Sequence, residues 1–176
     1  ICALREQGRA AVMAVLKKHT AATQDTIALP RYWRFVVELP RNAQAKIVAA
    51  DFQTAFAQAQ TAPEWPLEME NPAENEWQIS SRVPLDLVYF GGHFAQFPLV
   101  PGVVELQWVR DLAARFDWGR QSIVRVENLK YQQFLRPNDE ARVHLKFDAD
   151  KNKLTFRLEN TDAVCASGRL VFGGFQ

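Results

Sequence analysis

The sequence predicts an α+β fold, in which a curved antiparallel sheet packs around one long helix. Two patterns support this prediction. Residues 103–116 are apolar at helical spacing with little polar face, which is typical of a buried helix. After Gly119, apolar residues alternate with polar ones in several short runs, which predicts antiparallel strands.

The first elements form a small α/β appendage over residues 1–58. Residues 5–20 carry apolar side chains at helical spacing and predict an amphipathic helix. Residues 27–39 alternate around Trp33, Phe35 and Val37 and predict a strand. Residues 49–60 are rich in alanine and predict a short helix.

A stretch rich in proline and glutamate, residues 59–76, separates this appendage from the rest of the chain. Prolines without periodicity, together with like charges, are typical of a linker. Residues 77–176 then form the second domain, and the sequence has no internal repeat. Its strands are predicted, in order, around residues 77–83, 124–126, 143–147, 154–158 and 164–172, with the polar turn DADKNK joining the third to the fourth.

Composition and charge argue against several classes of protein. The 176 residues include 21 basic and 20 acidic side chains, whereas a nucleic-acid-binding protein normally shows a basic excess. No apolar run reaches the roughly 18–20 residues of a membrane helix, so no membrane insertion is expected. Cys2 and Cys165 lack metal-ligand spacing, which predicts a reducing, cytoplasmic location and no metal. Because the first residue is Ile1, the sequence is expected to be a piece of a longer protein.

The stretch GGHFAQFPLVPGVVELQWV carries the groups with the clearest chemistry. His93 follows two glycines in an apolar loop, and a histidine near its ordinary pKa of about 6.5 acts as a base at neutral pH. Pro101 and Gly102 stand at the start of the predicted helix, whose free N–H groups stabilise a developing negative charge. This combination suits removal of a proton next to a carbonyl. Taken alone, the pattern is also explained by a structural histidine in a turn shaped by glycine and proline.

The ordered pattern G-H-F-x-x-x-P-x-x-P-G-V, from Gly92 to Val103, resembles the active-site motif of hot-dog-fold 3-hydroxyacyl-ACP dehydratases. VENLKYQQFLRPNDEARVHL and ASGRLVFG resemble later stretches of that family, so the resemblance covers about residues 77–173. It implies a hot-dog fold, with a long central helix wrapped by a curved antiparallel sheet, and a homodimer with active sites at its interface. It also implies an acyl carrier protein as partner, a substrate held on phosphopantetheine, and no metal or redox cofactor.

The resemblance implies roles for three positions, and helix geometry adds Asp111 as a candidate. His93 matches the histidine that removes the C2 proton, and Gly102 matches the glycine whose N–H polarises the thioester carbonyl. Gln107 stands where the family has the Glu or Asp that helps to expel the 3-hydroxyl, and an amide can bind a hydroxyl but cannot protonate it. Asp111, one turn further on the same face, is the candidate for part of the acid role, unless it forms an ion pair with a neighbouring arginine. Glu105 lies about 200° around the helix from Gln107, so it is expected to face away and to complement the helix dipole.

Residues 29–52 resemble the end of the C-terminal subdomain of AMP-forming acyl-CoA synthetases. Lys46 matches the lysine that contacts the acyl-adenylate, although Ala45 stands where glycine is usual. Only the last part of that subdomain is matched, so Lys46 is not expected to catalyse adenylation. Together the two resemblances suggest a fusion of an acyl-activating enzyme with a dehydratase, like those of bacterial aryl-polyene clusters. The sequence LVPGVVELQWV is similar to the dehydratases of that branch.

The sequence therefore predicts dehydration of a 3-hydroxyacyl group on an acyl carrier protein to the 2-enoyl thioester, in fatty acid or aryl-polyene-like lipid synthesis. Two alternatives remain open. One is hydrolysis of an acyl thioester, which needs Asp111 or Glu105 to activate water, and the other is a non-catalytic acyl-binding or dimerisation module. The residues expected to contact the acyl chain, unless they are plain core, are Phe94, Phe97, Pro98, Leu99 and Val103.

Overall fold

The structure is a computed structural model that describes residues 1–92 and 94–173, and it divides into two compact units. One, called the helical unit, comprises Ile1–Ala62 and Pro84–Leu99. The other, called the sheet unit, comprises Pro63–Val83 and the chain from Val100 onward. The Gly- and Pro-rich stretch around position 93 therefore belongs to the helical unit, which the division of the sequence at residues 59–76 does not anticipate.

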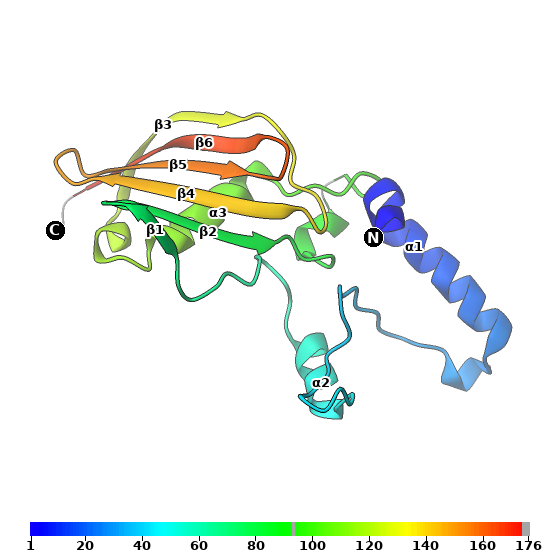
Figure 1. The fold of residues 1–176 in the computed structure, drawn as a ribbon. Helices are drawn as coiled ribbons and strands as arrows, with labels where there is room; N and C mark the ends of the chain where they lie inside the picture. Colours follow the sequence, from blue (N-terminus) through cyan, green and yellow to red (C-terminus); the bar gives the residue numbers. More distant parts are fainter. Residues whose placement is uncertain (93, 174–176) are drawn as a thin grey trace. The chain divides into compact units, whose positions relative to one another are not determined.

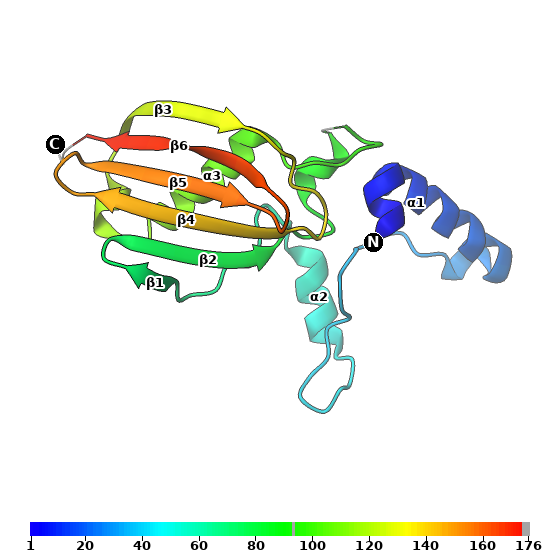
Figure 2. The same cartoon turned by 45° about the horizontal axis from the view of Figure 1, so that its top comes forward.

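The sheet unit contains an antiparallel sheet with the strand order β1-β2-β4-β5-β6-β3 (Figure 1). Helix α3 (Gly102–Ala113) lies along one face of this sheet, and the strands curve around it (Figure 2). The α+β prediction is confirmed, and β1 lies inside the stretch predicted as a linker. The strands are β1 (Glu70–Ala73), β2 (Glu76–Arg82), β3 (Ile123–Tyr131), β4 (Glu140–Asp148), β5 (Lys153–Glu159) and β6 (Val164–Phe172).

The core of the sheet unit follows from the period-two pattern of its strands. Every second residue of β5 is buried, and β4 and β6 bury most of theirs in the same way. Helix α3 turns Val104, Trp108 and Leu112 to the interior, at the spacing of one helix face. Its other face is exposed, with Val103 at 74% and Gln107 at the surface, so the prediction of a helix buried on most sides is wrong. The apolar run hides one exposed stripe, because positions 103, 107, 110 and 111 fall together on the helix, and the last three of them are polar.

Five aromatic rings cluster at one end of the sheet unit. Trp118 stacks on Phe147 with ring centroids 4.2 Å apart and on Phe116 at 5.1 Å. Trp77 lies 4.4 Å from Phe116, and Phe172 meets Trp118 edge-on at 5.9 Å. These rings come from β2, β4, β6 and the segment after α3. They therefore fix the C-terminal end of the helix to the sheet.

The helical unit contains α1 (Cys2–Thr23), α2 (Ala49–Ala57) and the short 3-10 segments η1 (Thr26–Ala28) and η2 (Val88–Gly91). The two helices confirm the predictions at residues 5–20 and 49–60. The strand predicted at residues 27–39 is wrong, because the described part of this unit holds no strand for it to pair with. Side chains satisfy its backbone instead.

The backbone of the wrongly predicted strand is held by two side chains. Arg9 Nη2 donates to the carbonyl of Trp33 at 3.0 Å, and the N–H of Phe35 donates to Asp86 at 3.4 Å. Asp86 is 7% exposed and also pairs with Arg9 and, at 3.3 Å, with Arg34. A buried carboxylate between two guanidinium groups thus replaces the ladder of a sheet.

No described helix combines the length and the apolar character needed to cross a bilayer.

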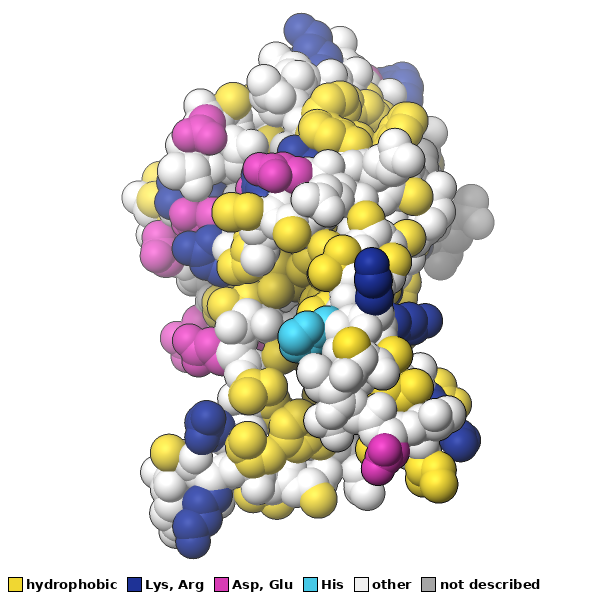
Figure 3. Space-filling view, turned by 90° about the vertical axis from the view of Figure 1, so that its right-hand side faces the viewer, with side chains coloured by type: hydrophobic (Ala, Val, Ile, Leu, Met, Phe, Trp, Pro, Cys, Tyr) yellow, Lys and Arg dark blue, Asp and Glu magenta, His cyan; other side chains and the backbone are white. Residues whose placement is uncertain are grey.

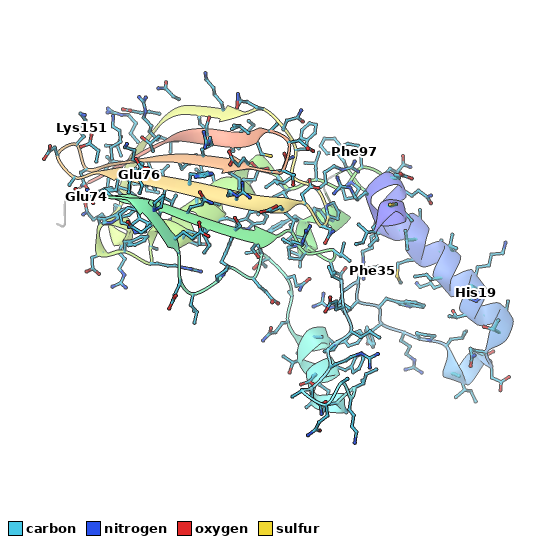
Figure 4. The ribbon with its side chains drawn as sticks, viewed as in Figure 1. His19, Phe35, Glu74, Glu76, Phe97 and Lys151 are labelled. Atoms are coloured by element: carbon cyan, nitrogen blue, oxygen red, sulfur yellow. The ribbon has the colours of Figure 1, made fainter. Side chains whose placement is uncertain are left out.

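Both cysteines are unpaired, and burial raises the pKa of the Cys165 thiol to about 12. His19 is exposed near the end of α1 (Figure 4). His144, on β4, is half-buried and pairs with Glu159 at 2.8 Å. Figure 3 shows that hydrophobic side chains gather in several clusters on the face that it presents, with charged side chains scattered around them.

Candidate active site

His93, the predicted base, lies outside the described residues, so the structure shows only the chain on either side of it. Gly91 and Gly92 are exposed, and a Cβ added at either position would meet no atom within 4 Å. Phe94 is 63% exposed and has a φ of 52°, in the left-handed region that few large residues adopt. The flanks of position 93 are thus open to solvent, which leaves room for a ligand to approach this backbone.

Helix α1 packs against the segment that follows position 93. Gly8 interrupts α1 with a φ of 78°, and a Cβ there would clash with the carbonyl of Ala95. Glycine alone combines this backbone angle with so close an approach. A cavity beside this contact is lined by Met13 of α1 and by Phe90, among others. Helix α1 therefore positions the segment that follows position 93. In the sequence, this role is marked only by Gly8, a glycine inside a helical pattern.

The start of α3 offers free backbone donors. Pro101 precedes the helix, and no side chain caps it. The Pro101 carbonyl accepts hydrogen bonds from the N–H groups of Val104 at 2.9 Å and Glu105 at 3.2 Å. The N–H groups of Gly102 and Val103 therefore have no acceptor within the helix. The Gly102 N–H is the donor that the resemblance assigns to the thioester carbonyl.

Tyr131, at the end of β3, covers Gly102. Its hydroxyl donates to the carbonyl of Gly102 at 2.9 Å. A Cβ at position 102 would lie 2.5–2.9 Å from three carbons of the tyrosine ring, which no real structure tolerates without a shift. Glycine is therefore required here by close approach. Tyr131 lies in the stretch VENLKYQQFLRPNDEARVHL, which resembles a later segment of the dehydratases. That resemblance was the feature of the sequence that pointed to this region.

Gln107 and Asp111 form a pair on the exposed face of α3. The Gln107 side-chain amide donates to Asp111 Oδ1 at 2.6 Å, across one turn of the helix. Among the described residues the interaction found for Asp111 is the one with Gln107 and not an ion pair with an arginine, so that alternative is not supported. The structure brings Gln107 and Asp111 together. The Asp111 carboxylate binds the Gln107 amide and orients it.

Glu105 faces the opposite way, as the helix geometry predicts, but its surroundings are unexpected. It is only 2% exposed, and its Oε2 has no hydrogen-bond partner among the described residues. Burial raises the pKa of Glu105 to about 8. The carboxyl is therefore largely neutral at pH 7, so the expected role as an anion complementing the helix dipole is wrong.

We expect the stability of the protein to fall as the pH rises because of Glu105. The pKa of Glu105 is about 8 when folded, against an ordinary 4.5, so between these values the unfolded chain releases a proton that the folded chain keeps. The contribution is fully present below pH 4.5 and is lost by about pH 8, on the order of 5 kcal/mol at about 1.4 kcal/mol per pKa unit. Urea unfolding of the wild type and Glu105→Gln across this range measures it. The difference between the two should change with pH, and parallel curves would contradict the buried acid.

The residues expected to contact the acyl chain divide into two groups. Phe94, Phe97 and Val103 are 63%, 45% and 74% exposed, so apolar surface lies open at these positions. Pro98 and Leu99 are buried, which also fits the alternative that they are core. Figure 4 shows where Phe97 lies in the chain that follows position 93. Within the described residues, no three His, Cys, Asp or Glu side chains are placed to hold a metal ion.

The sequence profile of the ApeI-like family, described as ApeI dehydratase, matches residues 69–169, which is more than half of the chain. Among curated proteins, the chain is similar to the 3-hydroxyacyl-(acyl-carrier-protein) dehydratase FabZ of Lactococcus lactis subsp. lactis strain IL1403, with 27% identity over 82 residues. That alignment covers 43% of this chain and 57% of the relative, so the chain spans little more than half the length of the curated relatives it matches.

Solved structures show the same likeness. The dehydratase heterocomplex ApeI:P from Xenorhabdus doucetiae aligns with a TM-score of 0.56 and 30% identity, over 62% of this chain and 96% of that one. An uncharacterised protein from Erwinia carotovora subsp. atroseptica aligns with a TM-score of 0.56 and 28% identity, over 64% and 96%. The dehydratase domain of the CurF module of curacin polyketide synthase, at 15% identity over 68% and 46% with a TM-score of 0.52, shares the fold alone. These likenesses identify the sheet unit as a hot-dog fold.

Proposed function

The chain belongs to the ApeI-like dehydratase family, and from this membership we propose that it dehydrates a 3-hydroxyacyl thioester to the 2-enoyl thioester. The observation that carries the proposal is the uncapped start of α3 at Gly102, nine positions after His93, within the region that the family profile matches. The FabZ relatives are named for substrates on an acyl carrier protein, which supports such a carrier as the partner of this chain. The proposed pathway is aryl-polyene or fatty acid synthesis, in which the acyl group is bound as a thioester to phosphopantetheine.

The residues divide the reaction between them. His93 takes the proton from C2, while the N–H groups of Gly102 and Val103 bind the thioester oxygen and stabilise the enolate-like charge. Electrons from the C2–H bond form the C2=C3 double bond, and the C3–O bond breaks. The departing hydroxyl takes up a proton from solvent and leaves as water, and His93 later returns the C2 proton to solvent. Gln107 hydrogen-bonds this hydroxyl, and Asp111 fixes the orientation of the Gln107 amide. The exposed apolar side chains of Phe94, Phe97 and Val103, with Pro98 and Leu99 behind them, are proposed to contact the acyl chain.

We propose that the protein is a homodimer through β3. This strand pairs only with β6 in the described sheet, so its other edge is free. The strand and the loop after it carry apolar side chains that are 36–64% exposed, and a second copy of the strand would cover them. They are Val124, Val126, Leu129, Tyr131 and Phe134. Gln107, on the exposed face of α3, would then serve the site of the second copy, as the resemblance implies.

Replacing Val124 and Val126 by glutamate is expected to convert the dimer to monomers, because charges cannot be buried unpaired at the new edge contact. Sedimentation velocity at a fixed concentration measures the change. Leu67→Glu is the matched control, since Leu67 is 94% exposed in the sheet unit outside β3. A variant that stays dimeric would overturn the β3 interface. A wild type that is monomeric alone and pairs only with a different hot-dog subunit would point to a heterocomplex instead.

Residues 29–52 are proposed to be the end of an AMP-forming ligase subdomain. Ala45, where that family has glycine, has a φ of 59°, the conformation that glycine favours. The side-chain carbonyl of Asn42 accepts hydrogen bonds from the N–H groups of Gln44 and Lys46 at 3.0 and 2.9 Å, which holds this turn. The exposed position of Lys46 suits a contact with another domain rather than catalysis within this chain.

The proposed function is tested by incubating the wild type with a 3-hydroxyacyl carrier-protein thioester and following the thioester by mass spectrometry. We expect loss of one water from an intact thioester. Release of a free acid would instead show hydrolysis, and an unchanged substrate would support a binding or dimerisation module. Either of the last two results would overturn the proposal.

A further inference from the structure

The sheet unit has a face turned away from α3, on which the exposed side chains of the strands are mostly charged (Figure 2). Most cations of this face are paired with an acid. The pairs, with N–O distances of 2.6–3.1 Å, are Arg125–Glu127, Arg142–Glu140, Lys146–Glu76, Lys153–Glu127 and Arg157–Glu159. Two cations on neighbouring strands differ. Among the described residues, the side chains of Lys130 on β3 and Arg169 on β6 form neither an ion pair nor a hydrogen bond.

Lys130 and Arg169 line the same hollow, which has a volume of about 400 Å³ and is called the sheet hollow below. Its other polar side chains are Asn128, Thr155 and Ser167, and none of them has a hydrogen-bond partner in the part of the chain that the structure describes. No acid is among the described residues that line it. The sheet hollow therefore combines positive charge with unused hydrogen-bond donors.

The pairing of β3, β5 and β6 explains why these side chains meet. Arg169 lies opposite Thr155 of β5, and Ser167 lies opposite Lys130 of β3. Ser167 and Arg169 are two residues apart on β6, so they share one face of the sheet. Opposite residues have Cβ atoms about 5 Å apart and diagonal ones about 7–8 Å apart. Two cations and two hydroxyls thus surround one point above β6.

A bulge in β3 brings Lys130 to this point. Glu127 lies opposite Arg169, so a regular ladder would place Leu129 opposite Ser167. Instead the register shifts between Glu127 and Lys130, where Asn128 has a φ of 51°, and Lys130 takes the place of the leucine. Bulges of this kind change the direction of a side chain at a chosen position. The irregularity of β3 therefore puts a cation where the regular strand would have an apolar residue.

The carboxylate of Glu127 does not neutralise Arg169, although the two residues are opposite in the ladder. Its Oε1 accepts from Arg125 at 2.7 Å, and its Oε2 accepts from Lys153 at 2.9 Å. Both oxygens are therefore engaged by other cations, and the charge of Arg169 stays available to a ligand.

We propose that the sheet hollow binds a phosphate group, either as inorganic phosphate or as the phosphate monoester of a small molecule. Its two positive charges match the charge of such a group, about −1.5 to −2 at pH 7. Arg169 is suited to two parallel hydrogen bonds with phosphate oxygens, and Lys130 supplies a point charge. The hydroxyls of Thr155 and Ser167 donate to the remaining oxygens. The site lies on the sheet face away from α3, so the inference does not depend on the proposed dehydration.

Titration of the wild type with inorganic phosphate at constant ionic strength tests the site, followed by two-dimensional proton–nitrogen NMR. We expect saturable shifts of the amide signals of residues 128–130 and 167–169, with a Kd of about 1 mM or below. Arg169→Gln and Lys130→Gln should each weaken binding about tenfold or more, because each removes a charge-assisted hydrogen bond. Both side chains are exposed, so neither variant should change the free energy of unfolding.

Lys146→Gln is the matched control. It removes a positive charge from the same face of the sheet, but from the ion pair with Glu76 and outside the sheet hollow. We expect its Kd to stay within about twofold of the wild type. Equal weakening in all three variants would overturn the proposal, because general attraction to a basic surface responds to any lost charge. Shifts in the wild type that do not saturate by about 20 mM phosphate would overturn it as well.

Phenyl phosphate separates the two sources of the phosphate group. Affinity similar to that of inorganic phosphate would identify monoesters as the ligand class, whereas binding of inorganic phosphate alone would identify the free ion. Either result supports the site. No turnover is measured in these titrations, so a failure of the proposed dehydration and a failure of the phosphate site are told apart.

Discussion

Replacing His93 by alanine is expected to lower turnover of a 3-hydroxyacyl carrier-protein thioester about 10²–10⁴-fold, which is the usual contribution of a positioned general base. The expectation rests on the motif in which Gly92 and Pro101 flank the histidine, because His93 itself lies outside the described residues. Steady-state rates of wild type and variant measure it. The loss should appear in kcat, since removal of the C2 proton belongs to the transition state rather than to substrate binding.

The matched control for this variant is His19→Ala. His19 is exposed near the end of α1, so its removal tests the loss of an imidazole without touching the motif. We expect wild-type rates from it. An H93A enzyme that is folded by circular dichroism and turns over within about threefold of wild type would rule out the histidine as base.

Replacing Gly102 by alanine should cost both stability and turnover. The new Cβ would lie 2.5–2.9 Å from three ring carbons of Tyr131, so the ring or the helix start must move. Overpacking of this kind costs about 1–3 kcal/mol of unfolding free energy. Displacing an N–H group aimed at a developing oxyanion costs about 10²–10³ in kcat. Urea unfolding and steady-state kinetics measure the two effects.

A double-mutant cycle with Tyr131→Ala separates the clash from other causes. Alanine at position 102 keeps its N–H group, so removing the tyrosine ring should restore part of the stability and part of the rate. The coupling energy should therefore be clearly favourable in the G102A/Y131A protein. Strictly additive losses would contradict the close approach of Tyr131, and an unperturbed G102A would contradict the role given to this helix start.

The sheet unit could be predicted closely from sequence, because its pattern and its packing agree. The last strand, residues 164–172, and the turn joining β4 to β5 fall where the alternation and the polar run place them. Each of these strands buries one face against α3, so the period of two in the sequence directly reports the core. The start of α3 was equally plain, since Pro101 and Gly102 mark it.

Other features needed the structure because they depend on partners distant in the sequence. Residues 27–39 alternate like a strand, but Asp86, 51 residues from Phe35, takes the place of a neighbouring strand by accepting the N–H of Phe35. Nothing in the pattern around Gly8 says that its backbone meets Ala95. The neutral state of Glu105 likewise arises from burial in the folded unit, whereas its place in the first turn of α3 suggests a solvated anion.

The position of a single oxygen atom tests the central claim most directly. The wild type is incubated with a 2-enoyl carrier-protein thioester in water enriched in oxygen-18, and the products are analysed by mass spectrometry. A dehydratase working in reverse adds this water to the double bond, so we predict that the label appears in the C3 hydroxyl of an intact 3-hydroxyacyl thioester. Label in the carboxylate of a released free acid, or no incorporation at all, would contradict the account.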